Sequence, residues 1–117
     1  MKTLTVQENI FKALSDKSRL RVIKMLQKKP LCVCEITELL QLATSTVSNH
    51  LSVLCDAGLV IGEKDGKWMN YRINTEPQSN LISSALLYLQ FILEDDETIL
   101  NDRRIIASVD RNVLCCK

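Results

Sequence analysis

The chain has 117 residues, 46% of them hydrophobic and 25% charged, which suits one small globular domain with a modest core. No apolar run is long enough to span a membrane, and the first residues lack the pattern of a signal peptide. We therefore expect a single domain, residues 1–117, in the cytoplasm, where five cysteines would be reduced thiols and not disulfides.

The formal net charge of +1 is unevenly distributed along the chain. Residues 1–75 carry eleven Lys or Arg against seven Asp or Glu, a net charge of +4, and residues 76–117 have a net charge of −3. Phosphate contacts require a basic surface, so any nucleic-acid-binding part is expected in the first two thirds of the chain.

Two helices are predicted at the N-terminus. The first covers about 6–14, where apolar residues recur at helical spacing. Asp16 or Ser15 can cap the second, and Pro30 ends its pattern. Its apolar stripe of Leu20, Ile23 and Leu26 predicts a basic outer face formed by Lys17, Arg21, Lys24 and Lys28.

Residues 31–57 are predicted to form a helix-turn-helix. A short helix begins at Cys34 and ends at Leu40, 41–43 form the turn, and Thr44 can cap a helix that ends near Ala57. Residues 58–74 then alternate with a period near two around Asp65-Gly66, which predicts a two-stranded wing.

Residues 76–117 are predicted to hold a dimerisation helix and a cysteine tail. Residues 75–78 fit a capping box, and the helix that follows has an apolar stripe too broad for one small domain to cover. Such a stripe usually marks an interface, so we expect a homodimer. A last helical stretch, about 97–110, leads to Cys115 and Cys116. The expected fold is mainly α with a small β-hairpin: a winged helix-turn-helix, dimeric through its terminal helices.

Double-stranded DNA is the partner that this architecture predicts. Residues 41–57 contain no Lys or Arg, so base reading falls to polar side chains of the second helix of the motif: Ser45, Thr46, Ser48, Asn49 and His50. Phosphate contacts are expected from Lys64, Lys67 and Arg72 on the wing, and from Lys17 or Arg19. His50 could instead be a packed helix residue.

Cys32 and Cys34 are the leading candidates for a metal site, because thiolate sulfur selects soft ions. On a regular helix, residues two apart point about 200° away from each other, so both can bind one ion only at a distorted helix start. There the helix dipole would favour thiolates, and binding would shift the recognition helix. Two structural thiols are the alternative.

Cys115 and Cys116 could supply a third sulfur to this site from either subunit, or the tail cysteines could be incidental. They could also form a separate site with Cys55, although the neighbours of Cys55 favour a place in the core. An enzyme is not expected, because His50 is the only histidine and does not face Cys55 on their shared helix. A structural zinc module is a further alternative, although the helices and wing supply a core without metal.

The chain resembles the ArsR/SmtB family of winged helix-turn-helix repressors over nearly its whole length. The resemblance lies in 13–20 (ALSDKSRL), 31–36 (LCVCEI), 45–51 (STVSNHL), and 57–60 (AGLV) followed by 66–72 (GKWMNYR). It implies a repressor that binds operator DNA as a homodimer and releases it when an ion binds.

The paired cysteines are similar to those of arsenical-resistance repressors and of cadmium or lead sensors in that family. Two departures matter: Thr37 stands where some arsenic-responsive members have a third cysteine, and 1–11 lacks the N-terminal cysteines of cadmium and lead sensors. The histidines of the family's zinc sensors are also missing. In related repressors trivalent arsenic or antimony takes three sulfurs, so As(III) or Sb(III) is the expected inducer. A cadmium- or lead-responsive repressor, or a thiol-redox-responsive one, is the alternative.

Overall fold

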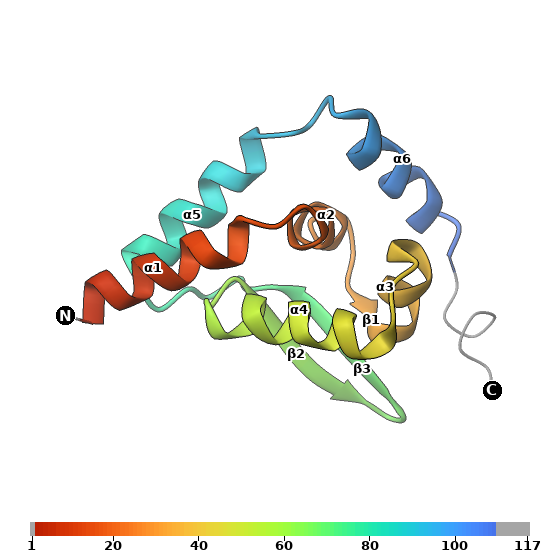
Figure 1. Cartoon of the computed structure of the whole chain (residues 1–117), viewed down its shortest axis with the longest axis horizontal. Helices are drawn as coiled ribbons and strands as arrows, with labels where there is room; N and C mark the ends of the chain where they lie inside the picture. Colours follow the sequence, from red (N-terminus) through yellow and green to blue (C-terminus); the bar gives the residue numbers. More distant parts are fainter. Residues whose placement is uncertain (1, 110–117) are drawn as a thin grey trace.

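The computed structural model of the chain describes residues 2–109 (Figure 1). Over this range the elements follow in the order α1 (Lys2–Leu14), α2 (Lys17–Leu26), β1 (Leu31–Cys32), α3 (Val33–Leu40), α4 (Thr44–Asp56), β2 (Val60–Asp65), β3 (Trp68–Ile73), α5 (Asn80–Phe91) and α6 (Glu97–Ile106). No helix in the described range is long and apolar enough to cross a membrane.

The two N-terminal helices form as predicted, although α1 begins earlier, at Lys2. Asp16 caps α2, since its Oδ1 accepts a hydrogen bond from the backbone N–H of Arg19 at 3.1 Å. The helix ends at Leu26, before Pro30.

The prediction of a basic, solvent-facing side on α2 holds for Lys17 and Lys28, which are exposed, but is wrong for Lys24 and Arg21. Lys24 is fully buried: its Nζ donates to the carbonyl of Leu89 at 2.7 Å and lies 2.6 Å from the carboxylate of Glu94. Arg21 makes a bidentate ion pair with Asp102 on α6, with two contacts of 2.9 Å. The covering residues lie more than sixty positions further along the chain, so helical periodicity within α2 could not reveal them.

Helices α3 and α4 form the predicted helix-turn-helix, with Gln41 in the left-handed region (φ 57°) at the turn. The first helix starts one residue earlier than expected, at Val33. Thr44 does not cap α4 as predicted: Ala43 occupies the capping position, no side chain caps the helix, and Thr44 is its first residue.

The wing consists of β2 and β3, which pair antiparallel from Val60↔Ile73 to Asp65↔Trp68. This register leaves Gly66-Lys67 as the two-residue turn, one position later than the Asp65-Gly66 prediction, and Gly66 takes φ +62°. A third strand, β1, was not predicted; it pairs with β3 and gives the sheet order β1-β3-β2.

The capping box predicted at 75–78 is also wrong. The first helical residue of α5 is Asn80, and Ser79 caps the helix by accepting from the backbone N–H of Leu81 at 3.0 Å. Asn74 accepts from the N–H of Glu76 at 2.9 Å, which holds the preceding residues in a turn.

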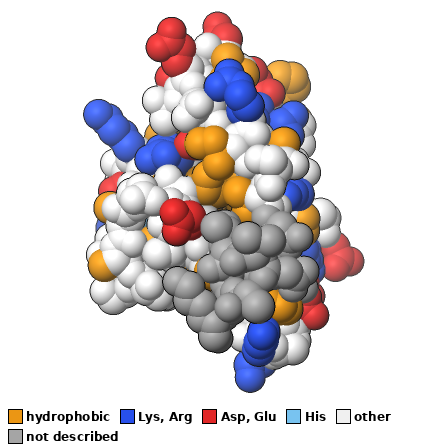
Figure 2. Space-filling model, turned by 90° about the vertical axis from the view of Figure 1, so that its right-hand side faces the viewer, with side chains coloured by type: hydrophobic (Ala, Val, Ile, Leu, Met, Phe, Trp, Pro, Cys, Tyr) orange, Lys and Arg blue, Asp and Glu red, His pale blue; other side chains and the backbone are white. Residues whose placement is uncertain are grey.

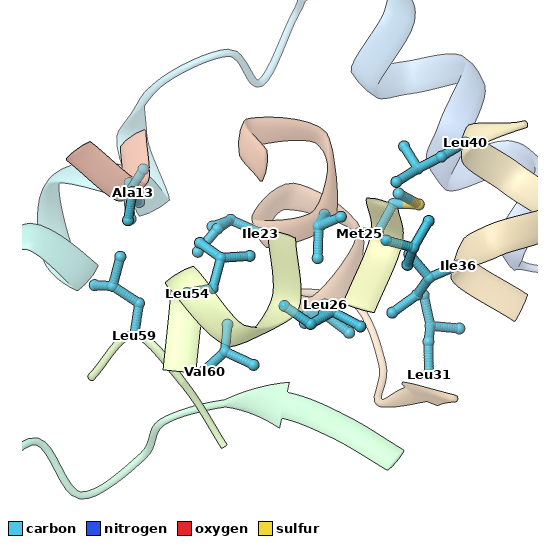
Figure 3. Close-up of a cluster of buried hydrophobic side chains, with 14 of the residues drawn as sticks. Ala13, Ile23, Met25, Leu26, Leu31, Ile36, Leu40, Leu54, Leu59 and Val60 are labelled. Atoms are coloured by element: carbon cyan, nitrogen blue, oxygen red, sulfur yellow. The ribbon is translucent and has the colours of Figure 1, made fainter. Parts of the chain in front are cut away.

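The core lies between α2, α3, α4 and the inner ends of the strands (Figure 3). In this view Ile23 and Leu26 of α2 lie near the centre of the core, with Leu54 and Val60 on one side of them. Leu31 of β1 lies on the other side, with Ile36 and Leu40 of α3. Helices α1 and α5 run side by side at one end of the molecule, and α6 lies on α2 near the other end (Figure 1). Since Leu31 is anchored in the core, the position of Cys32 is fixed by its neighbour.

Candidate functional site

Helix α4 presents a polar face away from the core. Val47, Leu51 and Leu54 are buried against the other helices, so the remaining face of α4 is turned outward. Of the residues predicted to read DNA bases, Ser45, Thr46, Ser48 and Asn49 are exposed. Their hydroxyl and amide groups are therefore accessible to a groove of DNA.

His50 differs from the other predicted base-reading residues, because it is half-buried and faces another part of the protein. Its Nδ1 lies 3.1 Å from Nη1 of Arg19. The same guanidinium donates to the carbonyls of Ala13 and Lys12, each at 2.9 Å. Arg19, predicted as a possible phosphate contact, is thus occupied by intramolecular bonds, whereas Lys17 is exposed.

The predicted phosphate contacts on the wing have unequal surroundings. Lys64 and Lys67 are exposed near the tip, and the Lys67 ammonium lies 4.9 Å from the ring centroid of Trp68. Arg72 lies further from the tip, and its Nε donates to Glu63 at 2.9 Å, which compensates part of its charge. The two lysines are the better placed cations for a phosphate backbone.

Cys32 and Cys34 lie where a strand changes into a helix. Cys32 ends β1 and is the N-cap of α3, with an extended backbone (φ −89°, ψ 164°), and Cys34 is the second residue of the helix. Because Cys32 is outside the regular helix, the 200° separation expected of two helical residues does not apply to this pair. This meets the condition expected from the sequence for binding of one ion by both sulfurs. Cys32 is buried and is a free thiol. Cys34 is half-buried and is disulfide-bonded in the structure, so the prediction that all five cysteines are reduced thiols is wrong for this residue.

The electrostatic environment of Cys32 is the opposite of the one predicted. Burial raises the pKa of its thiol, and the neighbouring Glu35 carboxylate adds to that effect. The backbone N–H groups of Glu35 and Cys34 act in the other direction, as a helix N-terminus should, but the net pKa is raised. Glu35 is held close because its Oε1 accepts from the N–H of Cys32 at 2.9 Å.

A groove of about 860 Å³ opens beside the two cysteines. One wall is the start of α3 with the turn that follows it, and the other is the tip of the wing. Among its lining residues are Cys32, Cys34, Glu38, Lys67, Trp68 and Met69. Sequence reasoning missed the wing side of this groove, because the signal is the β1–β3 pairing of Cys32 with Asn70, and β1 has only two residues.

Of the other three cysteines considered as metal ligands, the structure describes only Cys55. Cys115 and Cys116 lie outside the described residues, and within 2–109 no three His, Cys, Asp or Glu side chains form a metal-binding group. Cys55 packs against the core, where burial and the charge of Asp56 raise the pKa of its thiol, although the backbone N–H of Gly62 acts in the opposite direction.

Figure 2 shows the end of the molecule that carries α3 and α6, where acidic and basic side chains are interspersed. The basic surface expected from residues 1–75 is therefore partly neutralised here. Arg21 faces Asp102, and Glu94 is 3.2 Å from Arg103 as well as paired with Lys24. The cations that are left exposed include Lys64 and Lys67 of the wing.

This arrangement of an exposed recognition helix, a two-residue turn hairpin and surrounding helices defines a winged helix-turn-helix DNA-binding protein. Residues 16–61 match the family described as bacterial regulatory protein, arsR family. The chain belongs to this family and is a transcriptional regulator.

Two curated relatives illustrate the membership. The chain is 39% identical to the arsenical resistance operon repressor of Bacillus subtilis over 80 residues, which cover 68% of this chain and 76% of the relative. It is 34% identical to the cadmium resistance transcriptional regulatory protein CadC homolog of Staphylococcus aureus, over 68% of this chain and 66% of the relative.

One similar solved structure is a homodimeric winged helix-turn-helix DNA-binding domain from Mycobacterium bovis, a possible ArsR-family transcriptional regulator. It superimposes with a TM-score of 0.64 at 21% identity, over 93% of this chain and 90% of that chain. This similarity supports the fold assignment.

Proposed function

We propose that the protein is a homodimeric repressor that binds operator DNA and is released from it when trivalent arsenic or antimony binds cysteine thiolates. The observation that carries the proposal is the position of Cys32 and Cys34, in a groove whose walls are the start of α3 and the tip of the wing. A soft ion bound there is in contact with the supports of both DNA-binding elements. The curated relatives include both arsenical and cadmium resistance regulators, which agrees with a soft-ion inducer.

Release would follow from the geometry at the start of α3. To bind one ion, the sulfurs of Cys32 and Cys34 must converge, which changes the backbone where β1 becomes α3. Helix α3 packs against α4, and β1 is hydrogen-bonded to β3. The recognition helix and the wing are therefore both expected to move, with a shift limited by the ion's preference for one of the two states.

A tail thiol of the same chain is our candidate for the third sulfur. The last described residue, Val109, accepts a hydrogen bond from Nζ of Lys29 at 3.3 Å, and Lys29 is two residues before β1. From there to Cys115 or Cys116 an extended chain reaches at most about 25 Å. The tail of the same chain is therefore long enough to bring a thiol to Cys32 and Cys34.

The dimer would form through α1 and α5. These helices carry large apolar side chains that are exposed, whereas the residues of the core are buried. Phe91 is 76% exposed and Phe11 is 66% exposed. A groove of about 630 Å³, lined by residues of both helices, lies between them. A second copy, related by a two-fold axis, would cover this surface and set the spacing of two recognition helices on DNA.

The test measures fluorescence anisotropy of the reduced protein on labelled DNA from upstream of its own gene, with arsenite and cadmium titrated separately. Arsenite should release the wild type but neither Cys32→Ser/Cys34→Ser nor, if the tail supplies the third sulfur, Cys115→Ser/Cys116→Ser. Cys55→Ser is the matched control and should respond like the wild type. A reductant is essential, because a disulfide-bonded Cys34 cannot bind the ion.

Direct binding can be followed without DNA, because Trp68 is the only tryptophan and lines the groove. Its emission should change when arsenite is added to the wild type and stay constant in the Cys32→Ser/Cys34→Ser variant. Release by cadmium but not arsenite would assign the alternative inducer class. DNA binding that responds only to oxidant and reductant would overturn the metalloid proposal in favour of redox control.

A further inference from the structure

Arg19 connects three helices through its side chain and backbone. It lies in the first turn of α2, where its N–H is bonded to Asp16, and its guanidinium reaches back to the last turn of α1. There Nε donates to the Ala13 carbonyl and Nη2 to the Lys12 carbonyl, each at 2.9 Å. These carbonyls are at the helix C-terminus, where acceptors lack helical partners. The remaining nitrogen, Nη1, lies 3.1 Å from Nδ1 of His50 on α4.

The chemistry of the two groups fixes the direction of the last contact. A guanidinium has only donors, so Nδ1 of His50 must accept, and the ring proton must be on Nε2. Protonation of the ring converts Nδ1 into a donor and places a second positive charge at this distance from Arg19. The contact therefore exists only with a neutral imidazole.

We propose that Arg19 and His50 are positioning residues for DNA recognition, which hold the recognition helix α4 to the end of α1 through a contact that protonation of His50 breaks. The inference rests on the DNA binding of the proposed function but does not depend on the inducer. Since α1 belongs to the proposed dimer surface, this contact fixes α4 relative to the two-fold axis. Operator affinity should then fall when His50 is protonated, because the two half-sites require a fixed spacing of recognition helices.

The charged groups near His50 within the described residues agree with a contact that protonation of His50 breaks. Burial raises the pKa of Asp16, but the N–H and the positive charge of Arg19 lower it overall, and His50 adds to this lowering when its ring is protonated. Asp16 thus offsets part of the repulsion between imidazolium and guanidinium but cannot restore an acceptor at Nδ1. The other nearby charges of α1, Lys12 and Glu8, are exposed and lie 3.9 Å from each other.

The contact can be tested by NMR without DNA, because His50 is the only histidine in the chain. Long-range proton–nitrogen spectra should show the Nε2–H tautomer near pH 8, with Nδ1 unprotonated. Arg19→Gln should change the Nδ1 chemical shift, whereas Lys17→Gln, the matched surface control, should not. A wild-type histidine in the Nδ1–H form would overturn the proposal.

Operator affinity against pH gives the functional test. At constant salt the wild type should bind DNA about tenfold or more weakly near pH 5.5 than near pH 8. His50→Asn, whose Oδ1 can occupy the place of Nδ1 without titrating, should retain most of the affinity at both values. His50→Leu should bind weakly at both, and circular dichroism should show that it is folded.

A different role of His50 predicts the opposite sign. If the imidazolium contacted a phosphate, wild-type affinity would rise at acid pH, and this result would overturn the proposal, as would wild-type affinity of His50→Leu near pH 8. If the protein failed to bind DNA at any pH, the proposed function would fail. The tautomer measurement would still decide whether the Arg19–His50 contact forms.

Discussion

At the scale of single residues, Cys32 is the N-cap of α3 and is buried beside the carboxylate of Glu35. The thiolate is the reactive form of cysteine, and the raised pKa of Cys32 reduces its fraction near neutral pH. Burial is the largest cause of the raised pKa of Cys32. The negative charge of Glu35 is a further cause, and a single substitution can remove it. Glu35→Gln retains an oxygen that can accept from the Cys32 N–H but loses the negative charge.

We expect reduced Glu35→Gln protein to react faster at Cys32 with iodoacetamide near pH 8, because removal of the charge lowers the thiol pKa and increases the thiolate fraction. Peptide mass spectrometry would follow the rate at this cysteine alone. Glu38→Gln, on the exposed side of the same helix, is the control and should react like the wild type. An unchanged rate in Glu35→Gln would show that burial alone sets the pKa.

Asn49 is the exposed amide on the recognition helix, and an amide can make a bidentate contact with adenine. Asn49→Ala should weaken operator binding by about tenfold or more while leaving non-specific DNA binding nearly unchanged. Anisotropy on operator and scrambled DNA at one salt concentration measures both. Equal loss on the two DNAs would assign Asn49 to the backbone and not to a base.

At the scale of elements, α6 is attached to α2 by polar contacts that bury charged groups. Asp102 is only 2% exposed, and both of its oxygens accept from Arg21. Arg103 adds bonds to the carbonyl of Lys24 at 3.2 Å and to the side chain of Gln27 at 2.8 Å. Removing one member of such a set leaves its partner unsatisfied, which costs more than the bond itself contributes.

Asp102→Asn should therefore lower the free energy of unfolding by about 2 kcal/mol, as measured by urea denaturation. Amide hydrogen exchange should accelerate first in α6. Asp95→Asn makes the same charge change on an exposed residue and should alter stability by less than about 0.5 kcal/mol. Equal stability of the two variants would contradict the role given to the Arg21–Asp102 pair.

Acid should loosen the same attachment. The hydrogen bond from Lys24, together with the charges of Lys24 and Arg103, lowers the pKa of Glu94. A carboxylate whose pKa is lower in the folded state contributes stability above its unfolded pKa and loses it as the pH falls through the folded value. Wild-type stability should thus decrease below about pH 4.5, and it should decrease less steeply in Glu94→Gln, as followed by thermal unfolding at several pH values.

At the scale of the whole molecule, the exposed apolar side chains concentrate on α1 and α5, at the end of the protein away from α6 (Figure 1). A charge placed in that surface should prevent a second copy from docking. Phe11→Glu is expected to sediment as a monomer and to bind operator DNA at least about tenfold more weakly, because only one half-site is held.

Leu100→Glu is the matched control for this variant, since Leu100 is an exposed leucine on α6, outside the proposed interface. It should remain dimeric in analytical ultracentrifugation and bind DNA like the wild type. A dimeric Phe11→Glu protein would move the subunit interface elsewhere.

Local patterns were sufficient for much of the architecture. Asp16 caps α2 as predicted, α4 ends next to Ala57, and the strands of the wing pair on either side of Gly66. Capping, hydrophobic periodicity and turn chemistry depend on residues only a few positions apart, so the sequence expresses them directly. The same reasoning was less reliable at helix starts, where Ala43 and Ser79 replaced the predicted caps.

The cysteine pair was also visible in the sequence, but its surroundings were not. Local patterns alone predicted a winged helix-turn-helix with two cysteines at the start of its third helix, because soft ligands and helix patterns can be recognised from neighbouring residues. The packing of the elements was needed to show that Cys32 pairs with Asn70 of the wing, that Lys24 is buried beside Glu94, and that His50 contacts Arg19. Each of these contacts joins residues at least thirty positions apart, and their energy depends on how whole elements pack.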